Sequence, residues 1–463
     1  MAQSARYAWW LLIALFGFLI LLNNLIFLTL FFRRESPGLT EQQVRYELDS
    51  QLRYALFMSN LKWLRDGLKP AVKRMADSIR KELYGTEAEW EARLYVALME
   101  RLGGLGSAHA TLKGLSEAPS RRLLPHERRW YASLWCDALE GQLQPQQVPL
   151  LRDALSPAAP PLALRLAESL MWQQAGDARR AQAILTELQQ DSQLRWTALG
   201  VGACCGLLCA IAGVGLLLWY LVQQPPLAAR PLPDASPFIL DPTLWALVLF
   251  LIVMLNGEIA TETLKLERWL DAEWASIVIY LIAGLISFLF LWWWSQEGNN
   301  PAGVLRFRGS VWYQLGAALM GFGIYLPIML LSLLVTIWLS PALPSEQTHP
   351  LAERSFDEMG FGMALWMVLL AVVFAPVVEE VLFRGVLFQV LWQRTGRVWL
   401  SALVSGFLFG IIHPQFLGGI LSVTLLGITL AMVYAHTRSL LPCIVIHALN
   451  NAMATLVLWV FSG

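Results

Sequence analysis

The fold is decided by Ala375-Pro-Val-Val-Glu-Glu-Val-Leu-Phe-Arg-Gly385, because this stretch places three ionisable side chains in an apolar run. Glu379, Glu380 and Arg384 are the only charged residues between positions 360 and 389. An ionised side chain at the centre of a bilayer costs roughly 2.5–3.5 kcal/mol, so three unpaired ones would cost about 10 kcal/mol. We therefore expect these groups to pair with one another, to line a wet cavity or to take part in chemistry.

The composition indicates a membrane protein. Of its 463 residues, 56% are hydrophobic and 15% are charged, whereas charged residues make up about 25% of soluble domains. Long uncharged runs recur along the chain, which predicts helices that cross a bilayer. The formal net charge is zero, and a nucleic-acid-binding protein would show a basic patch. We expect an all-α, multi-pass protein of the plasma or inner cell membrane that contacts lipid and binds no nucleic acid.

Nine transmembrane helices are predicted. The first, residues 7–32, is interpreted as a retained anchor, because its uncharged run is too long for a signal peptide and no cleavage site follows. The segment 361–393 is expected to form one long helix with a kink at Pro376. Residues 398–437 must hold two helices, since Pro414 interrupts them. The other five helices are expected within residues 196–229, 242–257, 274–296, 309–345 and 439–463.

Residues 33–195 are predicted to form a separate soluble domain, which holds most of the charged residues. Apolar residues recur there at three- and four-residue spacing, which predicts helices. Three stretches, 92–115, 130–155 and 162–188, each indicate a helix, a short turn and a second helix. The last resembles a tetratricopeptide hairpin with its turn at Gly176. A repeat array and a plain helical bundle both remain open, and either would offer a surface to a protein partner.

Loop charges predict the orientation of the chain in the membrane. Arg306, Arg394 and Arg438 mark cytoplasmic loops, because positively charged loops tend to stay inside. This assignment places the soluble domain on the extracytoplasmic side. Arg33 and Arg34, which follow the first helix, favour the opposite orientation.

The spacing of the three charged residues predicts different roles for them. Glu380 and Arg384 are four residues apart, so on a helix they share one face and can pair. Glu379 is rotated by about 100° from Glu380 and has no partner on its own helix. We therefore expect Glu380 and Arg384 to be structural and Glu379 to be a reactive base.

Two further helices carry candidate residues at the same four-residue spacing. Phe409 and His413 share one face, so the phenyl ring can wall a site that contains the imidazole. His447 and Asn451 also project together, and an imidazole with an amide suits the stabilisation of an oxyanion. Counting about 1.5 Å per residue from the cytoplasmic arginines places Glu379 and both histidines within the hydrocarbon layer. These side chains can therefore meet in one intramembrane cavity.

The three motifs resemble those of the CPBP family of intramembrane proteases, also called the Abi or CAAX-protease-like family. The family pattern is Glu-Glu-x-x-x-Arg, Phe-x-x-x-His and His-x-x-x-Asn/Asp on successive helices. Here the motifs stand as Glu379-Glu380-Val-Leu-Phe-Arg384, Phe409-Gly-Ile-Ile-His413 and His447-Ala-Leu-Asn-Asn451. The resemblance covers roughly residues 310–463.

The resemblance implies a fold of transmembrane helices around a conical cavity and an endopeptidase that cuts a membrane-associated peptide. Glu379 and His413 would activate water, and His447 with Asn451 would stabilise the oxyanion. Family relatives include enzymes that trim prenylated C-terminal tails, but nothing in the sequence chooses between prenylated and unmodified substrates.

On the same basis, residues 309–463 are expected to be the catalytic core and residues 196–308 a set of accessory transmembrane helices. An alternative function is a non-catalytic membrane scaffold or sensor on the same fold. In that case the soluble domain would bind the partners.

Two interpretations of the cofactor remain. Two glutamates and two histidines resemble a hydrolytic zinc site, in which Glu379, His413 and His447 would be the ligands. Against this, no His-Glu-x-x-His sequence is present, and the family resemblance favours water activated directly by Glu and His. We therefore expect no metal and keep zinc as the alternative.

Overall fold

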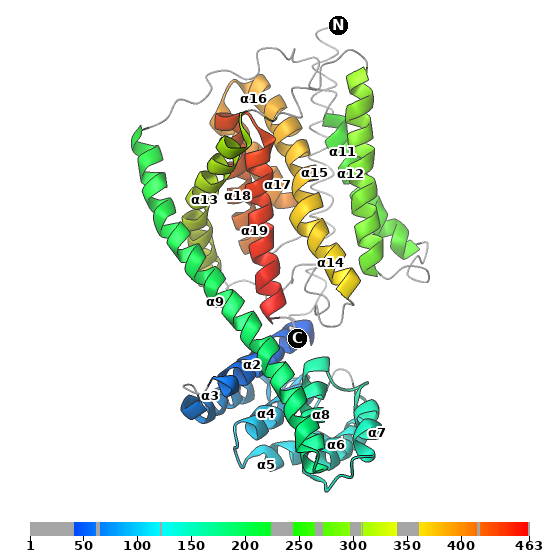
Figure 1. Cartoon of the computed structure of the whole chain (residues 1–463). Helices are drawn as coiled ribbons and strands as arrows, with labels where there is room; N and C mark the ends of the chain where they lie inside the picture. Colours follow the sequence, from blue (N-terminus) through cyan, green and yellow to red (C-terminus); the bar gives the residue numbers. More distant parts are fainter. Residues whose placement is uncertain are drawn as a thin grey trace. The chain divides into compact units, whose positions relative to one another are not determined.

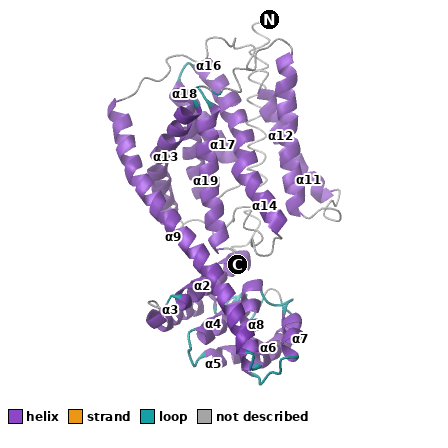
Figure 2. Cartoon of the chain, in the orientation of Figure 1, coloured by secondary structure: helices purple, strands orange, loops and turns teal. Residues whose placement is uncertain are grey.

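The computed structural model describes residues 41–61, 65–120, 123–223, 244–263, 272–296, 307, 309–339, 361–413 and 417–461. Every regular element in these ranges is a helix (Figure 2), which confirms the all-α prediction. The anchor expected at residues 7–32 lies outside the described residues. The chain divides into two compact units, one formed mainly by residues 37–203 and the other mainly by residues 204–349 and 361–454.

The first unit, called here the helical unit, is built entirely of helices in its described residues (Figure 1). Its elements are α2 (Glu41–Asn60), α3 (Arg65–Leu83), α4 (Glu89–Leu102), α5 (Ala108–Lys113), η2 (Gly114–Ser116), α6 (Pro125–Glu140), α7 (Gln147–Leu155), α8 (Pro161–Gln174) and the beginning of α9 (Ala178–Gln223).

Three helical hairpins, α4–α5, α6–α7 and α8–α9, occur at the three stretches predicted from the sequence. Pro125 and Pro161 begin helices, where the missing proline N–H leaves no hydrogen bond unmade. Gly176 turns the chain between α8 and α9 at a φ of +81°, which glycine adopts without strain. The tetratricopeptide character of the unit stays a prediction, because helical hairpins also occur in plain bundles.

The core of the helical unit is apolar, with the buried carboxylate of Glu100 beside it. The rings of Trp90 and Trp135 are fully buried. Glu100, which is 1% exposed, lies 2.5 Å from Arg80 and accepts a hydrogen bond from Thr111 at 2.9 Å. These contacts join α3, α4 and α5, so the hairpins share one packed interior rather than standing alone.

The second unit, called here the membrane unit, contains the long apolar helices (Figure 1). Besides parts of α9 and α19 (Leu440–Phe461), its elements are α11 (Leu244–Thr263), α12 (Ala272–Gln296), α13 (Val311–Leu339), α14 (Phe361–Leu369), η8 (Leu370–Phe374), α15 (Ala375–Glu380), η9 (Val381–Phe388), α16 (Gln389–Thr395), α17 (Val398–Ile412) and α18 (Leu417–Thr437).

Six of the described helices are long and apolar enough to cross a membrane: α9, α12, α13, the helix from α14 to α16, α18 and α19. Two shorter apolar helices, α11 and α17, complete the predicted positions after residue 195, and α17 and α18 are separate helices, as expected for residues 398–437. The predicted total of nine is not confirmed, because two helices are short and the first lies outside the described residues.

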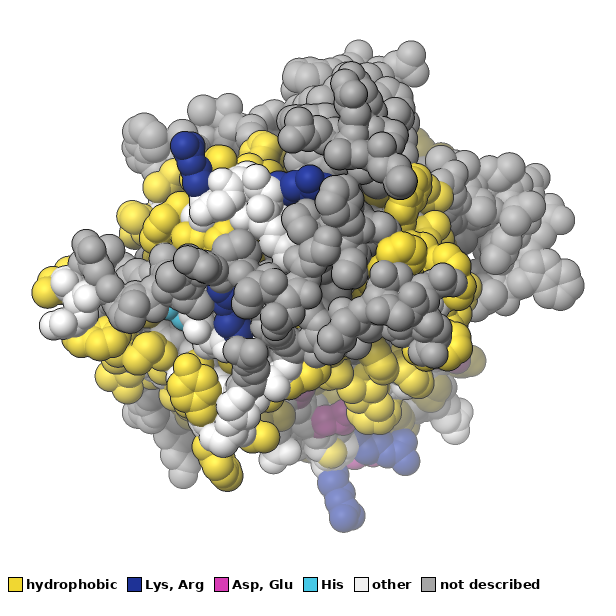
Figure 3. All heavy atoms as spheres, turned by 90° about the horizontal axis from the view of Figure 1, so that it is seen from above, with side chains coloured by type: hydrophobic (Ala, Val, Ile, Leu, Met, Phe, Trp, Pro, Cys, Tyr) yellow, Lys and Arg dark blue, Asp and Glu magenta, His cyan; other side chains and the backbone are white. Residues whose placement is uncertain are grey.

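Large apolar side chains are exposed on the helices of the membrane unit. Leu208 on α9, Leu319 on α13 and Trp399 on α17 are each more than half exposed. Figure 3 shows hydrophobic side chains around the rim of the molecule when it is seen from above. An apolar surface of this extent is typical of a membrane interaction site, so these side chains are placed to contact lipid.

The helix that carries the Glu-Glu motif contains two π-helical turns, η8 directly before α15 and η9 directly after it. Pro376 has no N–H and therefore cannot bond the carbonyl of Val372 four residues earlier, which lies within η8. The structure therefore has a wider π-helical turn, η8, directly before α15, where the sequence predicts a kink at Pro376. Such turns are frequent at functional sites, because they change which side chains share a helix face.

Helices α17 and α18 approach each other through glycines. A Cβ atom at Gly406 would lie 2.7 Å from the backbone nitrogen of Ile428 and 3.0 Å from the carbonyl oxygen of Thr424. One turn later Gly410 completes a Gly-x-x-x-Gly spacing, and Gly427 faces Gly406 from α18. Small residues at such positions allow membrane helices to pack backbone against backbone. The contact fixes α17, which carries Phe409 and leads to His413.

We expect Gly406→Ala to lower the free energy of unfolding by about 1–3 kcal/mol, because its methyl group would overlap backbone atoms that cannot move aside. The measurement is reversible unfolding of the purified protein in mixed detergent micelles. Gly316→Ala on α13 is the control, since a Cβ atom there has no neighbour within 4 Å. That change should be neutral or stabilise by up to about 1 kcal/mol. Equal effects of the two substitutions would contradict tight packing between α17 and α18 at Gly406.

Candidate active site

The two adjacent glutamates of α15 are both buried but face different partners. Glu379 is 7% exposed, and Glu380 and Arg384 are 0% exposed. All three residues lie on one helix that contains π-helical turns, so helix geometry alone does not determine the positions of their charged groups. Contacts with other helices determine these positions.

Glu380 and Arg384 form a fully buried ion pair. Arg384 Nη1 donates to Glu380 Oε1 at 2.8 Å, and Arg384 Nη2 donates to the carbonyl oxygen of Gly427 at 3.2 Å. The guanidinium carbon also lies 4.3 Å from the centre of the Phe409 ring, a distance at which cation and ring attract. The pairing predicted from the four-residue spacing is present, and it also ties α18 to the motif helix.

Glu379 points away from this pair and toward two imidazoles. Its Oε2 lies 3.5 Å from His413 Nε2 and 3.8 Å from His447 Nε2. That buried oxygen has no hydrogen bond. The other carboxylate oxygen, Oε1, accepts a hydrogen bond from the Tyr280 hydroxyl at 2.8 Å. The two oxygens of Glu379 therefore have different surroundings.

Each imidazole is held by its Nδ1 atom. His413 Nδ1 lies 2.7 Å from the carbonyl oxygen of Phe409, and His447 Nδ1 lies 2.9 Å from Glu380 Oε1. A carbonyl or carboxylate oxygen can only accept, so both Nδ1 atoms carry the proton. In the neutral rings both Nε2 lone pairs are then directed toward Glu379. His413 reaches this position because α17 ends just before it, with His413 itself in an extended conformation.

The site therefore brings three acceptor atoms together: Oε2 of Glu379 and the two Nε2 atoms. With both rings neutral, these three acceptors need a hydrogen-bond donor or a cation between them, whereas a proton on either Nε2 would let that ring donate to the carboxylate. A water molecule could donate one proton to the carboxylate and one to an imidazole. This arrangement can remove a proton from water, as a general base does.

The Phe409 ring packs against both imidazoles of the site. Its ring centre lies 4.7 Å from that of His413 and 5.5 Å from that of His447. It also meets Phe383 edge to face at 5.0 Å. The ring thus forms an apolar wall beside both imidazoles, whereas the spacing in the sequence suggested this contact for His413 alone.

Asn451 is placed differently from its predicted partner His447. Its Nδ2 donates to the carbonyl oxygen of Ala371 in η8 at 2.8 Å, and its Oδ1 lies 3.3 Å from Asn450 Nδ2. Asn450 in turn accepts a hydrogen bond from the Tyr325 hydroxyl at 3.1 Å. These bonds join α13, α19 and the motif helix, and the oxyanion role of Asn451 stays a prediction.

The donor types around Glu379 also suit a metal ion. His413 and His447 offer Nε2 atoms, and their Nδ1 protons are bonded to a carbonyl and a carboxylate, as is usual for histidine ligands. In the part of the chain that the structure describes, however, no group of three or more His, Cys, Asp or Glu side chains is arranged to hold a metal ion. The donor set fits zinc in kind, while the arrangement does not match a metal site.

Tyr280 was not predicted as part of the site. It lies on α12, in the segment 196–308 that the sequence marks as accessory helices. Its hydroxyl nevertheless contacts Glu379 directly. The single signal in the sequence is a tyrosine within an apolar helix, which also occurs in ordinary membrane helices.

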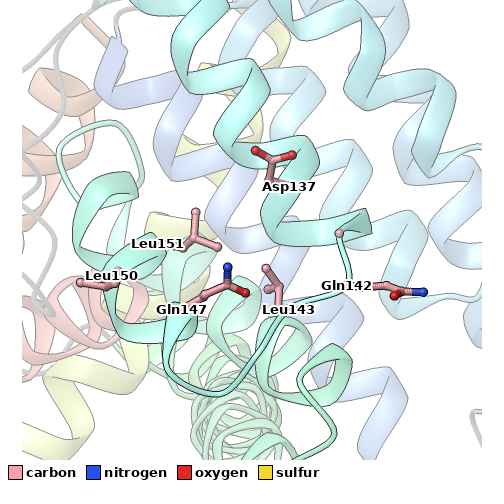
Figure 4. Close-up of a pocket in the computed structure, with 7 residues that line it drawn as sticks. Asp137, Gln142, Leu143, Gln147, Leu150 and Leu151 are labelled. Atoms are coloured by element: carbon pink, nitrogen blue, oxygen red, sulfur yellow. The ribbon is translucent and has the colours of Figure 1, made fainter.

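The helical unit contains a separate open pocket of about 420 Å³ between α6 and α7 (Figure 4). Its lining combines one carboxylate with two amide side chains and three leucines: Asp137, Gln142, Gln147, Leu143, Leu150 and Leu151, together with Gly141. This set contains no histidine, cysteine or hydroxyl nucleophile. The cluster of one carboxylate with two imidazoles lies in the membrane unit, which is why it is the candidate active site.

Comparison with known proteins supports the same assignment. Residues 361–453 match the family model described as type II CAAX prenyl endopeptidase Rce1-like. This C-terminal segment is CAAX-protease-like. The match contains every predicted site residue from Glu379 to Asn451, whereas Tyr280 lies outside it. The segment therefore resembles a CAAX-type membrane protease at family level, and the apolar helices make the chain a multi-pass membrane protein.

A curated relative of the chain is the protein described as putative membrane peptidase YdiL of Bacillus subtilis (strain 168). It is 30% identical over 90 residues, which are 19% of this chain and 36% of YdiL. The similarity thus spans little more than a third of the relative. No solved structure matches the chain.

Proposed function

We propose that the protein is an intramembrane endopeptidase that hydrolyses a peptide bond of a membrane-associated substrate. The observation that carries this proposal is the convergence of Glu379 Oε2 with the Nε2 atoms of His413 and His447, within 4 Å, in a buried site. The family match and the peptidase relative support the same class of reaction.

In the proposed reaction, Glu379 and His413 remove a proton from water. The resulting hydroxide attacks the carbonyl carbon of the scissile peptide bond, and the carbonyl oxygen becomes an oxyanion. The proton then passes to the leaving nitrogen as the carbon–nitrogen bond breaks, which yields a carboxylic acid and an amine. The net change is the addition of one water molecule across the bond.

His447 and Asn451 are proposed to stabilise the oxyanion. Since Nδ1 of His447 donates to Glu380, its Nε2 can donate only when the ring carries a second proton. The proposed step therefore uses an imidazolium at His447, and its single positive charge would offset the net charge of −1 left by two carboxylates and one guanidinium.

The family description names prenylated substrates, so a peptide ending in a farnesylated Cys-aliphatic-aliphatic-X sequence is the first probe to use. We propose the cell membrane as the location, with the helical unit extracytoplasmic and able to bind a protein partner. The loop arginines support this orientation, and the three hairpins offer helices to which a partner could bind.

The function is tested by comparing membrane proteomes of cells that express the wild-type protein or Glu379→Gln. A peptidase should leave one or more membrane-associated peptides uncut when Glu379 is replaced. Identical peptide profiles, with a phenotype that is also unchanged, would instead favour a non-catalytic scaffold or sensor.

Direct activation of water, without a metal, is proposed for this site. We expect less than about 0.1 zinc per chain in purified active protein and no loss of activity with a chelator, because water can be held by Glu379 and His413 alone. Elemental analysis by inductively coupled plasma and assays with EDTA or phenanthroline provide the measurement. One tightly bound zinc per chain, with activity lost on chelation and restored by zinc, would establish Glu379, His413 and His447 as ligands instead.

A further inference from the structure

The hydroxyl of Tyr280 contacts the carboxylate that the proposed mechanism uses. It donates to Glu379 Oε1 at 2.8 Å, while Oε2 has no hydrogen bond and lies toward the two imidazoles. The terminal torsion of a glutamate is broad and roughly two-fold, so the helix itself does not choose which oxygen faces His413. The tyrosine makes that choice, because it engages one oxygen and leaves the other for the reaction.

Tyr280 is itself held in place from two sides. Its ring meets Phe250 of α11 edge to face, with ring centres 5.4 Å apart. Two turns further along α12, Ser287 donates to the carbonyl oxygen of Ala246 at 2.8 Å, which fixes α12 against α11. Contacts between α11 and α12 therefore hold the Tyr280 hydroxyl in place.

The helix that carries Glu379, which runs from α14 to α16, packs against α12 at a glycine. Gly284 is one turn beyond Tyr280, and a Cβ atom there would lie 3.1 Å from Cγ2 of Val378. Val378 directly precedes Glu379. The close approach that glycine permits thus brings the backbone of the motif helix to a distance at which the tyrosine can reach the carboxylate.

We propose that Tyr280 is a positioning residue of the active site, which orients Glu379 so that Oε2 faces His413 and His447. Helices α11 and α12, which lie outside the CAAX-protease-like segment, are then part of the catalytic unit. This inference rests on the proposed peptidase function, and its test separates the two.

The test uses Tyr280→Phe in the purified full-length protein, which keeps the ring and its contact with Phe250. With a quenched fluorescent farnesylated peptide, kcat should fall about 10- to 100-fold, since the lost hydrogen bond involves a charged group. KM should change by less than about two-fold, because Tyr280 acts on the carboxylate and not on substrate affinity. Tyr313→Phe, at a tyrosine that is 57% exposed, should leave both constants unchanged.

A spectroscopic measurement tests the positioning without any substrate. The infrared carboxylate bands that disappear in Glu379→Gln belong to Glu379, and they should move in Tyr280→Phe but not in Tyr313→Phe. If the wild type cuts the peptide, Glu379→Gln does not, and Tyr280→Phe matches the wild type in both kcat and infrared bands, the inference is overturned while the proposed function stands. If the wild type leaves the farnesylated peptide uncut, that substrate proposal fails, and the infrared bands alone decide the inference.

Discussion

Glu379→Gln is expected to reduce peptide cleavage by the purified protein at least about 10³-fold, which is within the usual contribution of a general base. An amide cannot accept the proton of water, so the step in which the nucleophile forms is lost. The fold should survive, because the amide oxygen can still accept the hydrogen bond from Tyr280 and one buried charge is removed. The measurements are turnover of the farnesylated peptide and the midpoint of thermal unfolding.

A double substitution shows whether Glu379 acts together with His413. If both take part in removing one proton, Glu379→Gln combined with His413→Ala should be no slower than the slower single variant, since groups that act as a unit are strongly non-additive. Independent roles would instead multiply the two losses. Wild-type cleavage by Glu379→Gln would end the peptidase mechanism proposed here.

The parts of the site that depend on helical spacing could be predicted from the sequence. Glu380 and Arg384 share a face at four-residue spacing, and the structure pairs them at 2.8 Å. The reason is energetic: a charge in hydrocarbon is so costly that its partner is usually close in the sequence or on a facing helix. Phe409 and His413 follow the same spacing, and the ring packs against the imidazole.

The contacts that cross between distant helices could not be predicted. Tyr280 is 99 residues from Glu379, and α12 is apolar on all sides, so no amphipathic pattern shows which face is turned inward. His447 was paired with Asn451 by spacing, whereas its Nδ1 contacts Glu380 of another helix. Such contacts are determined by helix packing and by the π-helical turns around α15, neither of which leaves a periodic signal in a uniformly apolar segment.

The hairpins of the helical unit were predictable because local residues encode them. Pro125 and Pro161 favour helix starts, and Gly176 favours the left-handed turn. Whether the hairpins form a regular array depends on how successive pairs stack. That stacking depends on side chains whose spacing in the sequence is not constant.

Glu380→Gln is expected to lower the free energy of unfolding by about 3–5 kcal/mol, the usual cost of removing one partner from a buried ion pair. Arg384 would keep its hydrogen bond to Gly427 and its contact with Phe409, but its charge would have no counter-ion at 0% exposure. The measurement is unfolding in mixed detergent micelles. The control is Glu187→Gln in the helical unit, because Glu187 is 67% exposed and pairs with Arg165 at 2.7 Å. An exposed pair contributes only about 0–1 kcal/mol.

Removing both charges should lower the free energy of unfolding less than removing one. In Glu380→Gln combined with Arg384→Gln, no uncompensated charge remains in the membrane unit at this position, so stability should recover part of the loss. Activity should fall less in Glu380→Gln than in Glu379→Gln when both are measured on the folded fraction, since Glu380 supports His447 and does not face the proposed water. The division of roles between the two carboxylates would be wrong if Glu380→Gln folded like the wild type and yet cut no peptide. In that case Glu380 would belong to the proton-transfer machinery, and its bond to His447 Nδ1 would be the path through which it acts.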